Sequence, residues 1–375
     1  MLNLVSTAEA LPYYKHPENI EMFEKYGVLS GTEIISRCEI QLENYCKQIH
    51  IEALTMADMI KKDILPAACA YMKDISKEAI NKKQLCADIC CELEEKLLKK
   101  LSRLTADLYK EMEALEAAVA GAERVLEVFG ESAVYLEYLR RPVEKISSLP
   151  DGTPLAVRKM TESVMMLEEG DFTPLAAVAG TTADFAVEAM AAHGADYALA
   201  NNGGDIAWHI SRGQSTPRDF LKVGLISDIN GGRATHSLKI KSFGEIRGLA
   251  TSGLGGRSLT RGIASAVTAL APDSSRADAA ATAIANACYC DDPAIEQCLA
   301  EELDYGTDIR GLTVTKSVGC LRSGSAELAL EAGCRRAETL IGKGMIFGAV
   351  LFVAGAMQIV KTKERVDLFE VAALD

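Results

Sequence analysis

The sequence predicts an α+β protein with two unlike halves: an all-α helical hairpin or bundle, followed by an α+β domain. In residues 1–148, apolar side chains recur every three or four positions and glycine is rare. This spacing places the apolar side chains on one face of a helix. From residue 150, glycine pairs and short β-branched runs alternate with alanine-rich segments, which is typical of helices and of strands that end in glycine turns. The domains are therefore expected at 1–148 and 150–375.

The first half is expected to hold three helices. The first starts near Glu33, and its apolar face carries Ile35, Cys38, Leu42, Tyr45, Cys46 and Ile49. The second covers residues 92–119, with an apolar face of Leu97, Leu101, Leu104, Leu108, Met112 and Leu115. The third is expected over residues 133–146, where Pro142 should kink or end it.

Short runs beside glycine predict the strands of the second half: ADYALANNGGDIAWHI, FLKVGLIS, HSLKIKSF, GLATSGLGGRSLT and GLTVTKSVG. A further apolar run, residues 344–360, is shorter than the roughly 20 residues that a membrane-spanning helix needs. The "AG" pair at 354 and 355 splits this run into two strand-length pieces. We therefore expect a buried hairpin there and no membrane span.

Composition narrows the range of partners. At 375 residues, the chain is long enough for two domains that each bury a core. Its net charge of −13 argues against nucleic acid as a partner, because a general binder of phosphate backbones needs a basic face. The 11 cysteines show no zinc or iron–sulfur spacing, and the first residues lack the basic start of a secretory signal. We expect a cytoplasmic protein with free thiols.

The stretch GVLSGTEIISRCEIQLENYCKQIHIEALTMADMIKKDILPA, residues 27–67, resembles the C-terminal region of type III glutamine synthetases. The resemblance extends over residues 15–146 and implies a helical module of a ring-shaped assembly, so a homo-oligomer is expected. The family's glutamate- and nucleotide-binding strands lie upstream of this region, and no glutamine synthetase active site is expected here. Surface charges such as Glu39, Glu43 and Asp58 suit solvent or salt bridges. The join between the halves is open to three readings: a natural fusion, an engineered one or a sequence-assembly accident.

The alanine-rich run SSRADAAATAIANA, residues 274–287, carries Asp278 and Thr282 four residues apart. On a helix these two side chains lie on one face, one turn from each other. Because alanine is small, either an ion or phosphate, or simply a packed neighbouring backbone, can approach this face. Mg²⁺ usually takes one or two protein carboxylates and completes its shell with water and phosphate, which a single Asp beside a Thr would suit.

This run is similar to a helix of the ApbE flavin-transferase superfamily, in which an acid and a threonine hold magnesium against the FAD pyrophosphate. The resemblance implies that Asp278 and Thr282 contact Mg²⁺. The backbone carbonyl of Ala179, in LAAVAGTTADFAVEAM, is a third expected contact. TSGLGGRSLTRGIASAVT, followed by the alanine run, looks most like the C-terminal domain of 6-hydroxynicotinate reductases and their stand-alone relatives. That likeness covers residues 150–362.

Two glycine-rich segments are expected to bind the ligand. In ALANNGGDIAWHI, Gly203 and Gly204 would let backbone N–H groups approach it, with Asn202 and Asp205 as polar contacts; the alternative is a hairpin turn. The segment ATSGLGGRSLTRG is expected to contact the phosphate or the ring of the ligand; the alternative is a solvated loop. The expected contacts are Thr251, Ser252, Gly253, Gly255, Gly256 and Arg257. Arg261, in the same loop, also suggests an anion.

Departures from the flavin transferases bear on the reaction. The histidine-containing segment of those enzymes has no counterpart in LGGRSLTRGIA, and Gly180 directly follows Ala179 where the family has a lysine. His209 lies elsewhere. The predicted function is therefore Mg²⁺-assisted binding of a small phosphate-bearing ligand, FAD or FMN, with catalysis left open. The alternative is a non-catalytic oligomerisation protein that carries an inert ApbE-like scaffold.

Overall fold

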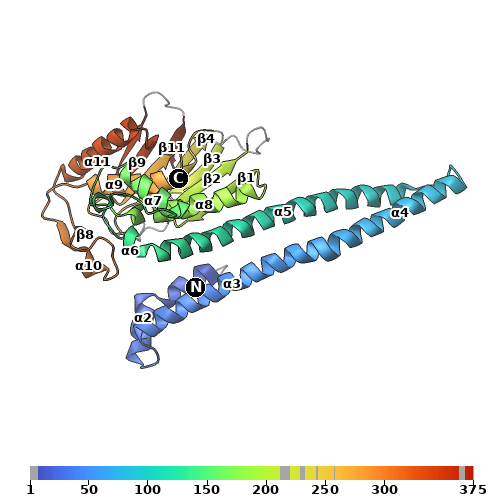
Figure 1. Ribbon diagram of the computed structural model, residues 1–375, viewed down its shortest axis with the longest axis horizontal. Coiled ribbons are helices and arrows are strands. Elements are labelled where there is room, and N and C mark those ends of the chain that lie inside the picture. The colour runs from blue at the N-terminus through green and yellow to red at the C-terminus, as the bar shows by residue number, and fades with distance from the viewer. Residues whose placement is uncertain are drawn as a thin grey trace. The chain divides into compact units, whose positions relative to one another are not determined.

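The computed structural model describes residues 7–211, 220–228, 233–241, 244–256, 258–362 and 368–374 (Figure 1). Contacts divide the chain into two compact units, Met1–Val119 (unit 1) and Ala120–Asp375 (unit 2). Unit 1 is helical and unit 2 contains every strand of the described residues, so the predicted α+β class is confirmed. The division between the units falls inside a long helix, and a domain boundary near residue 150 stays a prediction.

Unit 1 is built from helices that follow one another with short connections. Ser30 caps α3, because its hydroxyl accepts a hydrogen bond from the Glu33 N–H while the Glu33 carboxylate accepts one from the Ser30 N–H. A π-helical turn separates α3 from α4 just before Pro66. Proline has no N–H group for the regular helical hydrogen bond, and the altered turn accommodates this missing donor. The bounds are α1 Thr7–Tyr14, α2 Pro17–Lys25, α3 Gly31–Met59, the π turn Ile60–Ile64, α4 Leu65–Leu85 and α5 Glu92–Val134.

The predicted helical hairpin forms between the α3–α4 stretch and the first part of α5 (Figure 1). Ala57 and Ile60 pack against Met112 with partly buried leucines around them. Ion pairs of 2.5 Å join Lys61 to Glu116 and Lys82 to Glu94 across the two arms.

Three details of the predicted helical half differ from the prediction. Ile35, Leu42 and Ile49, expected on the apolar face of the first helix, are 42–47% exposed. Leu104, expected on the apolar face of the second helix, is 52% exposed. The third predicted helix is wrong as one element, since α5 continues to Val134 and is followed only by the short helix α6, Leu136–Leu139, and a 3₁₀ turn, Val143–Lys145. Pro142 precedes this turn, where its fixed backbone angle stops a longer helix.

Unit 2 contains a six-stranded antiparallel sheet in the order β1-β2-β5-β6-β9-β10. A second, three-stranded sheet has the order β11-β4-β3, and β7 pairs with β8. The strand bounds are β1 Tyr197–Asn202, β2 Asp205–Ile210, β3 Phe220–Leu225, β4 His236–Lys241, β5 Gly248–Ser252, β6 Ala266–Ala271, β7 Ile295–Leu299, β8 Thr313–Val318, β9 Gly348–Val353, β10 Ala356–Lys361 and β11 Phe369–Ala373.

Helices and the small sheet cover opposite faces of the large sheet (Figure 1). On β6, Val267 and Ala269 join the core under the helices, whereas Ala266 and Leu270 face the small sheet, as alternation along a strand requires. The helices of unit 2 are α7 Leu155–Met165, α8 Val178–Ala192 after a 3₁₀ turn at Pro174–Ala177, α9 Ser274–Ala287, α10 Ala300–Leu303 and α11 Ser325–Gly342.

The predicted hairpin at 344–360 is confirmed, but only its first strand, β9, is fully buried, whereas Met357 and Gln358 of β10 are exposed. β9 and β10 pair antiparallel, and Ala354 and Gly355 form the turn with positive φ angles of 47° and 84°. Among the described residues, one helical stretch, Pro174–Ala192, is long and apolar enough to cross a membrane, but half of its apolar window is buried in the protein, where α8 packs against α9, β1 and β2.

Candidate functional site

The site begins where α8 and α9 meet at Gly180. A β-carbon on this residue would lie 2.2 Å from the carbonyl oxygen of Ser274 and 2.9 Å from the β-carbon of Asp278. Any side chain would therefore force the two helices apart, which is the physical reason why glycine follows Ala179 here. The alanine helix is packed by a neighbouring backbone, as one of the two interpretations of the sequence holds, and this packing brings the start of α8 to Asp278.

Asp278 is held by backbone at the beginning of α8. The N–H of Gly180 donates a hydrogen bond of 3.0 Å to Oδ2 of Asp278. Burial raises the pKa of Asp278 well above its ordinary value, and the nearby carboxylate of Asp205 raises it further, although backbone hydrogen bonds from Gly180 and Ala179 act in the opposite direction. The two carboxyl groups are thus close enough for the charge of Asp205 to disfavour ionisation of Asp278.

The β1–β2 hairpin brings two further predicted residues to this place. Asn202 donates from Nδ2 to the carbonyl oxygen of Ala179, at 3.2 Å. Asp205 accepts a hydrogen bond from the Thr251 N–H, at 3.3 Å. We call Ala179, Asn202, Asp205 and Asp278 the Asp278 cluster.

The turn of this hairpin consists of Gly203 and Gly204, with φ angles of 70° and 114° that favour glycine. The N–H of Gly204 donates to the side chain of Asn201, at 3.0 Å. This glycine pair therefore forms a hairpin turn, and the N–H of Gly204 is already used within it.

Thr282 lies one turn further along α9, beside the end of β5. Its hydroxyl lies 3.5 Å from the hydroxyl of Ser252, and the hydroxyl of Thr251 lies 2.8 Å from that of Thr268. Gly253 approaches Ser265 closely, Gly255 has a φ of 88°, and the N–H of Gly256 donates to the Gly253 carbonyl. Arg257 lies outside the described residues. Ser252 is thus placed next to Thr282, and the glycine loop begins directly after it.

The donor atoms of the Asp278 cluster and of Thr282 suit a hard cation such as Mg²⁺, which prefers oxygen ligands. Asp278 and Asp205 offer carboxylates, Ala179 a backbone carbonyl and Thr282 a hydroxyl. Within the part of the chain that the structure describes, no three or more His, Cys, Asp or Glu side chains are grouped to hold a metal. Two carboxylates, a carbonyl and a hydroxyl suit an ion that takes few protein carboxylates and completes its shell with water and phosphate.

A carboxylate that the sequence analysis did not single out occupies the N-terminus of α9. Asp184, on α8, is 5% exposed and accepts hydrogen bonds from the N–H groups of Ser274 and Ser275, at 2.8 and 2.9 Å. It also forms an ion pair of 3.1 Å with Lys159. Burial lowers the pKa of Lys159, but nearby Asp184, Glu188 and Asp273 raise it to a net value above the ordinary one. An acid inside the apolar run TTADFAV, residues 181–187, was the signal in the sequence.

Because Asp184 fills the end of α9 where a helix usually attracts anions, a phosphate would have to approach α9 from its side. The neighbouring Asp273 side chain accepts a hydrogen bond from a third N–H group, that of Arg276, at 2.9 Å.

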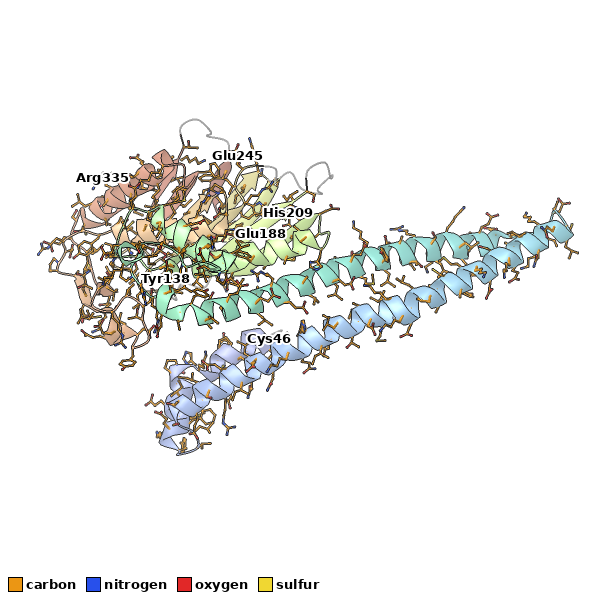
Figure 2. All side chains as sticks on the ribbon, viewed as in Figure 1. Cys46, Tyr138, Glu188, His209, Glu245 and Arg335 are labelled. Carbon is orange, nitrogen blue, oxygen red and sulfur yellow. The ribbon has the colours of Figure 1, made fainter. Side chains whose placement is uncertain are left out.

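Figure 2 labels Glu188, which follows Asp184 by one helical turn, and His209 on β2. Nε2 of His209 lies 3.4 Å from the Ser211 hydroxyl.

A hollow of about 370 Å³ lies near the C-terminal end of α9, lined by Glu169, Arg261, Ala283, Asn286, Ala287, Tyr289 and Gln297. It shares no described residue with the Asp278 cluster. Arg261 pairs with Asp171 and Glu169, and its guanidinium lies 5.1 Å from the centre of the Phe172 ring. The positive charge of Arg261, which predicted an anion contact, is therefore already compensated by two carboxylates of the protein.

Unit 2 is thus an antiparallel sheet with helices on one face, and two of these helices meet at Gly180 beside the half-buried carboxylate of Asp278. The chain belongs to the family described as AbpE bacteria, whose sequence profile matches residues 100–359. A second profile, described as Glutamine synthetase C-terminal domain, matches residues 1–83. Both predicted resemblances are confirmed.

Individual relatives divide in the same way. A UPF0280 protein of Methanosarcina barkeri is 34% identical over 192 residues, which cover 49% of this chain and 67% of that protein. A glutamine synthetase of Butyrivibrio fibrisolvens is 42% identical over 135 residues, which cover 36% of this chain but 19% of that protein. A type-3 glutamine synthetase of Dictyostelium discoideum is 41% identical over 81 residues, which cover 22% of this chain and 11% of that protein. The chain is thus similar to a small segment of the synthetases.

Proposed function

We propose that unit 2 binds Mg²⁺ together with a small phosphate-bearing ligand, a flavin nucleotide such as FAD or FMN, on the side of α9. The observation that carries the proposal is the closeness of Asp278 to the carboxylate of Asp205, at a place where burial already disfavours the charge of Asp278. A divalent cation relieves the repulsion between two such carboxylates, because it favours the ionised form of both. Membership of an ApbE-like family supports flavin as the ligand class.

In this proposal, each part of the cluster has a role. Asp278 and Thr282 contact the cation from α9, and the carbonyl of Ala179 faces it from α8. Asn202 fixes this carbonyl through its 3.2 Å hydrogen bond. Ser252 lies beside Thr282, and in this proposal the backbone of the glycine loop that follows it meets the ligand. We place the protein in the cytoplasm, and the likeness to 6-hydroxynicotinate reductases stays a prediction.

Calorimetric titration of the full chain with FAD, with and without Mg²⁺, tests the proposal. We expect binding that requires Mg²⁺ and weakens as the pH is lowered. The reason for the pH dependence is that the pKa of Asp278 is raised by burial and by Asp205, so its proton must leave before the cation binds. Equal FAD affinity with Mg²⁺ and with a chelator, or the absence of FAD binding under both conditions, would contradict the proposal.

A second candidate function, self-association through unit 1, is favoured by one surface feature. Ile35, Leu42, Ile49 and Met56 follow one another at seven-residue intervals on α3, and each is between 42% and 55% exposed. Seven-residue apolar spacing is the pattern of coiled-coil helices. We propose that this stripe pairs with the same stripe of a second copy of the chain, since two-fold interfaces join identical patches. Cys46 lies on the same helix (Figure 2).

Charges placed in this stripe should separate the copies without unfolding the hairpin. The double change Leu42→Asp and Ile49→Asp is expected to reduce the mass measured by light scattering to that of one chain, with unchanged helical circular dichroism. Ile80→Asp, on an exposed residue of α4 outside the stripe, is the matched control and should keep the assembly. A wild-type chain that is already single would contradict self-association. Breaking the partly buried Leu97–Leu108 face instead would disturb the hairpin itself.

A further inference from the structure

Three polar residues form a row along α9. Asp278, Thr282 and Asn286 follow at four-residue intervals, and every other residue from 277 to 287 is alanine or isoleucine. Four-residue spacing keeps side chains on one side of a helix, and at 1.5 Å per residue the row is about 12 Å long. The row therefore leads from the Asp278 cluster to the hollow at the end of α9, which Asn286 lines.

The segment that follows β5 contacts the same row at two points. The chain leaves β5 at Ser252, beside Thr282, and meets α9 again at Asn286. There the hydroxyl of Thr260 and the N–H of Arg261 both donate to Oδ1 of Asn286, at 3.1 and 2.8 Å. Both ends of the loop are thus tied to the polar row. Because Oδ1 of Asn286 is occupied, its amide Nδ2 is the group that this side chain can offer a ligand.

Charge distinguishes the hollow from the Asp278 cluster. Glu169 accepts a salt bridge of 2.5 Å from Arg336 and faces Arg261 at 3.7 Å, while Arg261 also pairs with Asp171. The positive and negative groups around the hollow therefore compensate one another. The remaining lining is neutral and consists of two alanine methyl groups, a phenol and two carboxamides, from Ala283, Ala287, Tyr289, Asn286 and Gln297.

We infer that this hollow binds the uncharged, planar ring of the ligand whose phosphates lie at Asp278. The inference rests on the proposed function and adds which end of the ligand is recognised there. A heteroaromatic ring fits this lining because Tyr289 offers an aromatic face and the carboxamides of Asn286 and Gln297 offer hydrogen bonds to ring nitrogen and oxygen atoms. Its volume is in the range of small-molecule pockets, about 300–1,000 Å³.

The test compares two probes, FAD and inorganic pyrophosphate, each titrated with Mg²⁺ into the full chain. Tyr289→Ala is expected to weaken FAD binding roughly 5- to 150-fold, the usual effect of losing one base–aromatic stack. Gln297→Ala, which removes the partner of the Tyr289 hydroxyl at 3.4 Å, should weaken FAD binding less. Pyrophosphate, which has no ring, should bind both variants as it binds the wild type. Tyr305→Ala, on a tyrosine that is 83% exposed and outside the hollow, is the control.

The outcomes separate this inference from the proposed function. If Tyr289→Ala leaves FAD affinity unchanged while wild-type binding still requires Mg²⁺, the ring lies elsewhere and only the inference is overturned. If the variant loses FAD and pyrophosphate equally, the side chain supports the fold rather than the ring, and the inference is again overturned. If the wild type binds neither probe with Mg²⁺, the proposed function fails, and the inference fails with it.

Discussion

Replacing Asp278 with alanine is expected to abolish the Mg²⁺-dependent part of FAD binding. The change removes the carboxylate that the Gly180 N–H holds at 3.0 Å, and with it the charge that faces the cation. Truncating one partner of a buried, hydrogen-bonded charge pair costs about 2–5 kcal/mol, which is roughly 30-fold to several-thousand-fold in affinity. Titration of FAD with and without Mg²⁺ measures this loss. Glu123→Ala, on α5, provides a control for the removal of one acidic side chain elsewhere.

Asp278→Asn refines this expectation, because it keeps the shape of the side chain and removes the charge. Mg²⁺ binding should be lost as in the alanine variant. The free energy of unfolding, in contrast, should rise at neutral pH. The folded chain holds the Asp278 proton more tightly than the unfolded chain does, because burial and Asp205 raise the pKa. The free energy of unfolding of the wild type therefore falls as the pH rises from the ordinary pKa to the raised one.

The asparagine variant lacks this titration, so we expect it to unfold at a higher urea concentration than the wild type at neutral pH without Mg²⁺. Equal urea midpoints over the whole pH range would show that the charge of Asp278 costs the fold nothing. Such a result would remove the electrostatic reason for placing a cation there.

Replacing Asp184 with alanine is expected to cause the largest loss of stability in unit 2. The change deprives the N–H groups of Ser274 and Ser275 of their acceptor. It also leaves Lys159, whose side chain is 24% exposed, without its buried partner. Breaking a buried ion pair by removing one partner costs about 3–5 kcal/mol, and the free energy of unfolding measured in urea should fall by this amount.

Glu188→Ala is the matched control for Asp184→Ala, because Glu188 pairs with the same lysine at 3.2 Å but is 60% exposed. An exposed ion pair contributes about 0–1 kcal/mol, so this variant should unfold almost as the wild type does. Asp184→Asn retains one carbonyl oxygen and should lie between the two. If Asp184→Ala and Glu188→Ala unfold at the same urea concentration, the capping of α9 from α8 contributes little to stability.

The sequence predicted the elements of the fold better than their lengths. Glycine turns and the "AG" pair located the hairpins β1–β2 and β9–β10 because a positive φ at glycine is a local requirement. The end of α5 could not be predicted in this way. Its residues after 119 keep a helical pattern, but Gly121 suggests an ending that packing overrides, since its α-carbon faces Met190 and the Ala186 carbonyl.

The site shows the same limit. The spacing of Asp278 and Thr282 on one helix face follows from the sequence, and their resemblance to a known family indicated Ala179, Asn202 and Asp205. Asp184 was missed because its partners are backbone N–H groups 90 and 91 residues away, and such partners leave no motif. The hollow was missed for a related reason. Glu169, Arg261 and Asn286 come from segments far apart in the chain, which only tertiary packing brings together.

The close approach at Gly180 has a consequence for how this place can change during evolution. A contact made by the Ala179 carbonyl survives any substitution of its side chain, so scanning that position with other residues would pass over it. The path of the main chain is set instead by the neighbouring Gly180. Even the β-carbon of an alanine there would lie 2.2 Å from the Ser274 carbonyl oxygen and push the two helices apart. Inheritance of the contact therefore depends on a residue that has no functional group of its own.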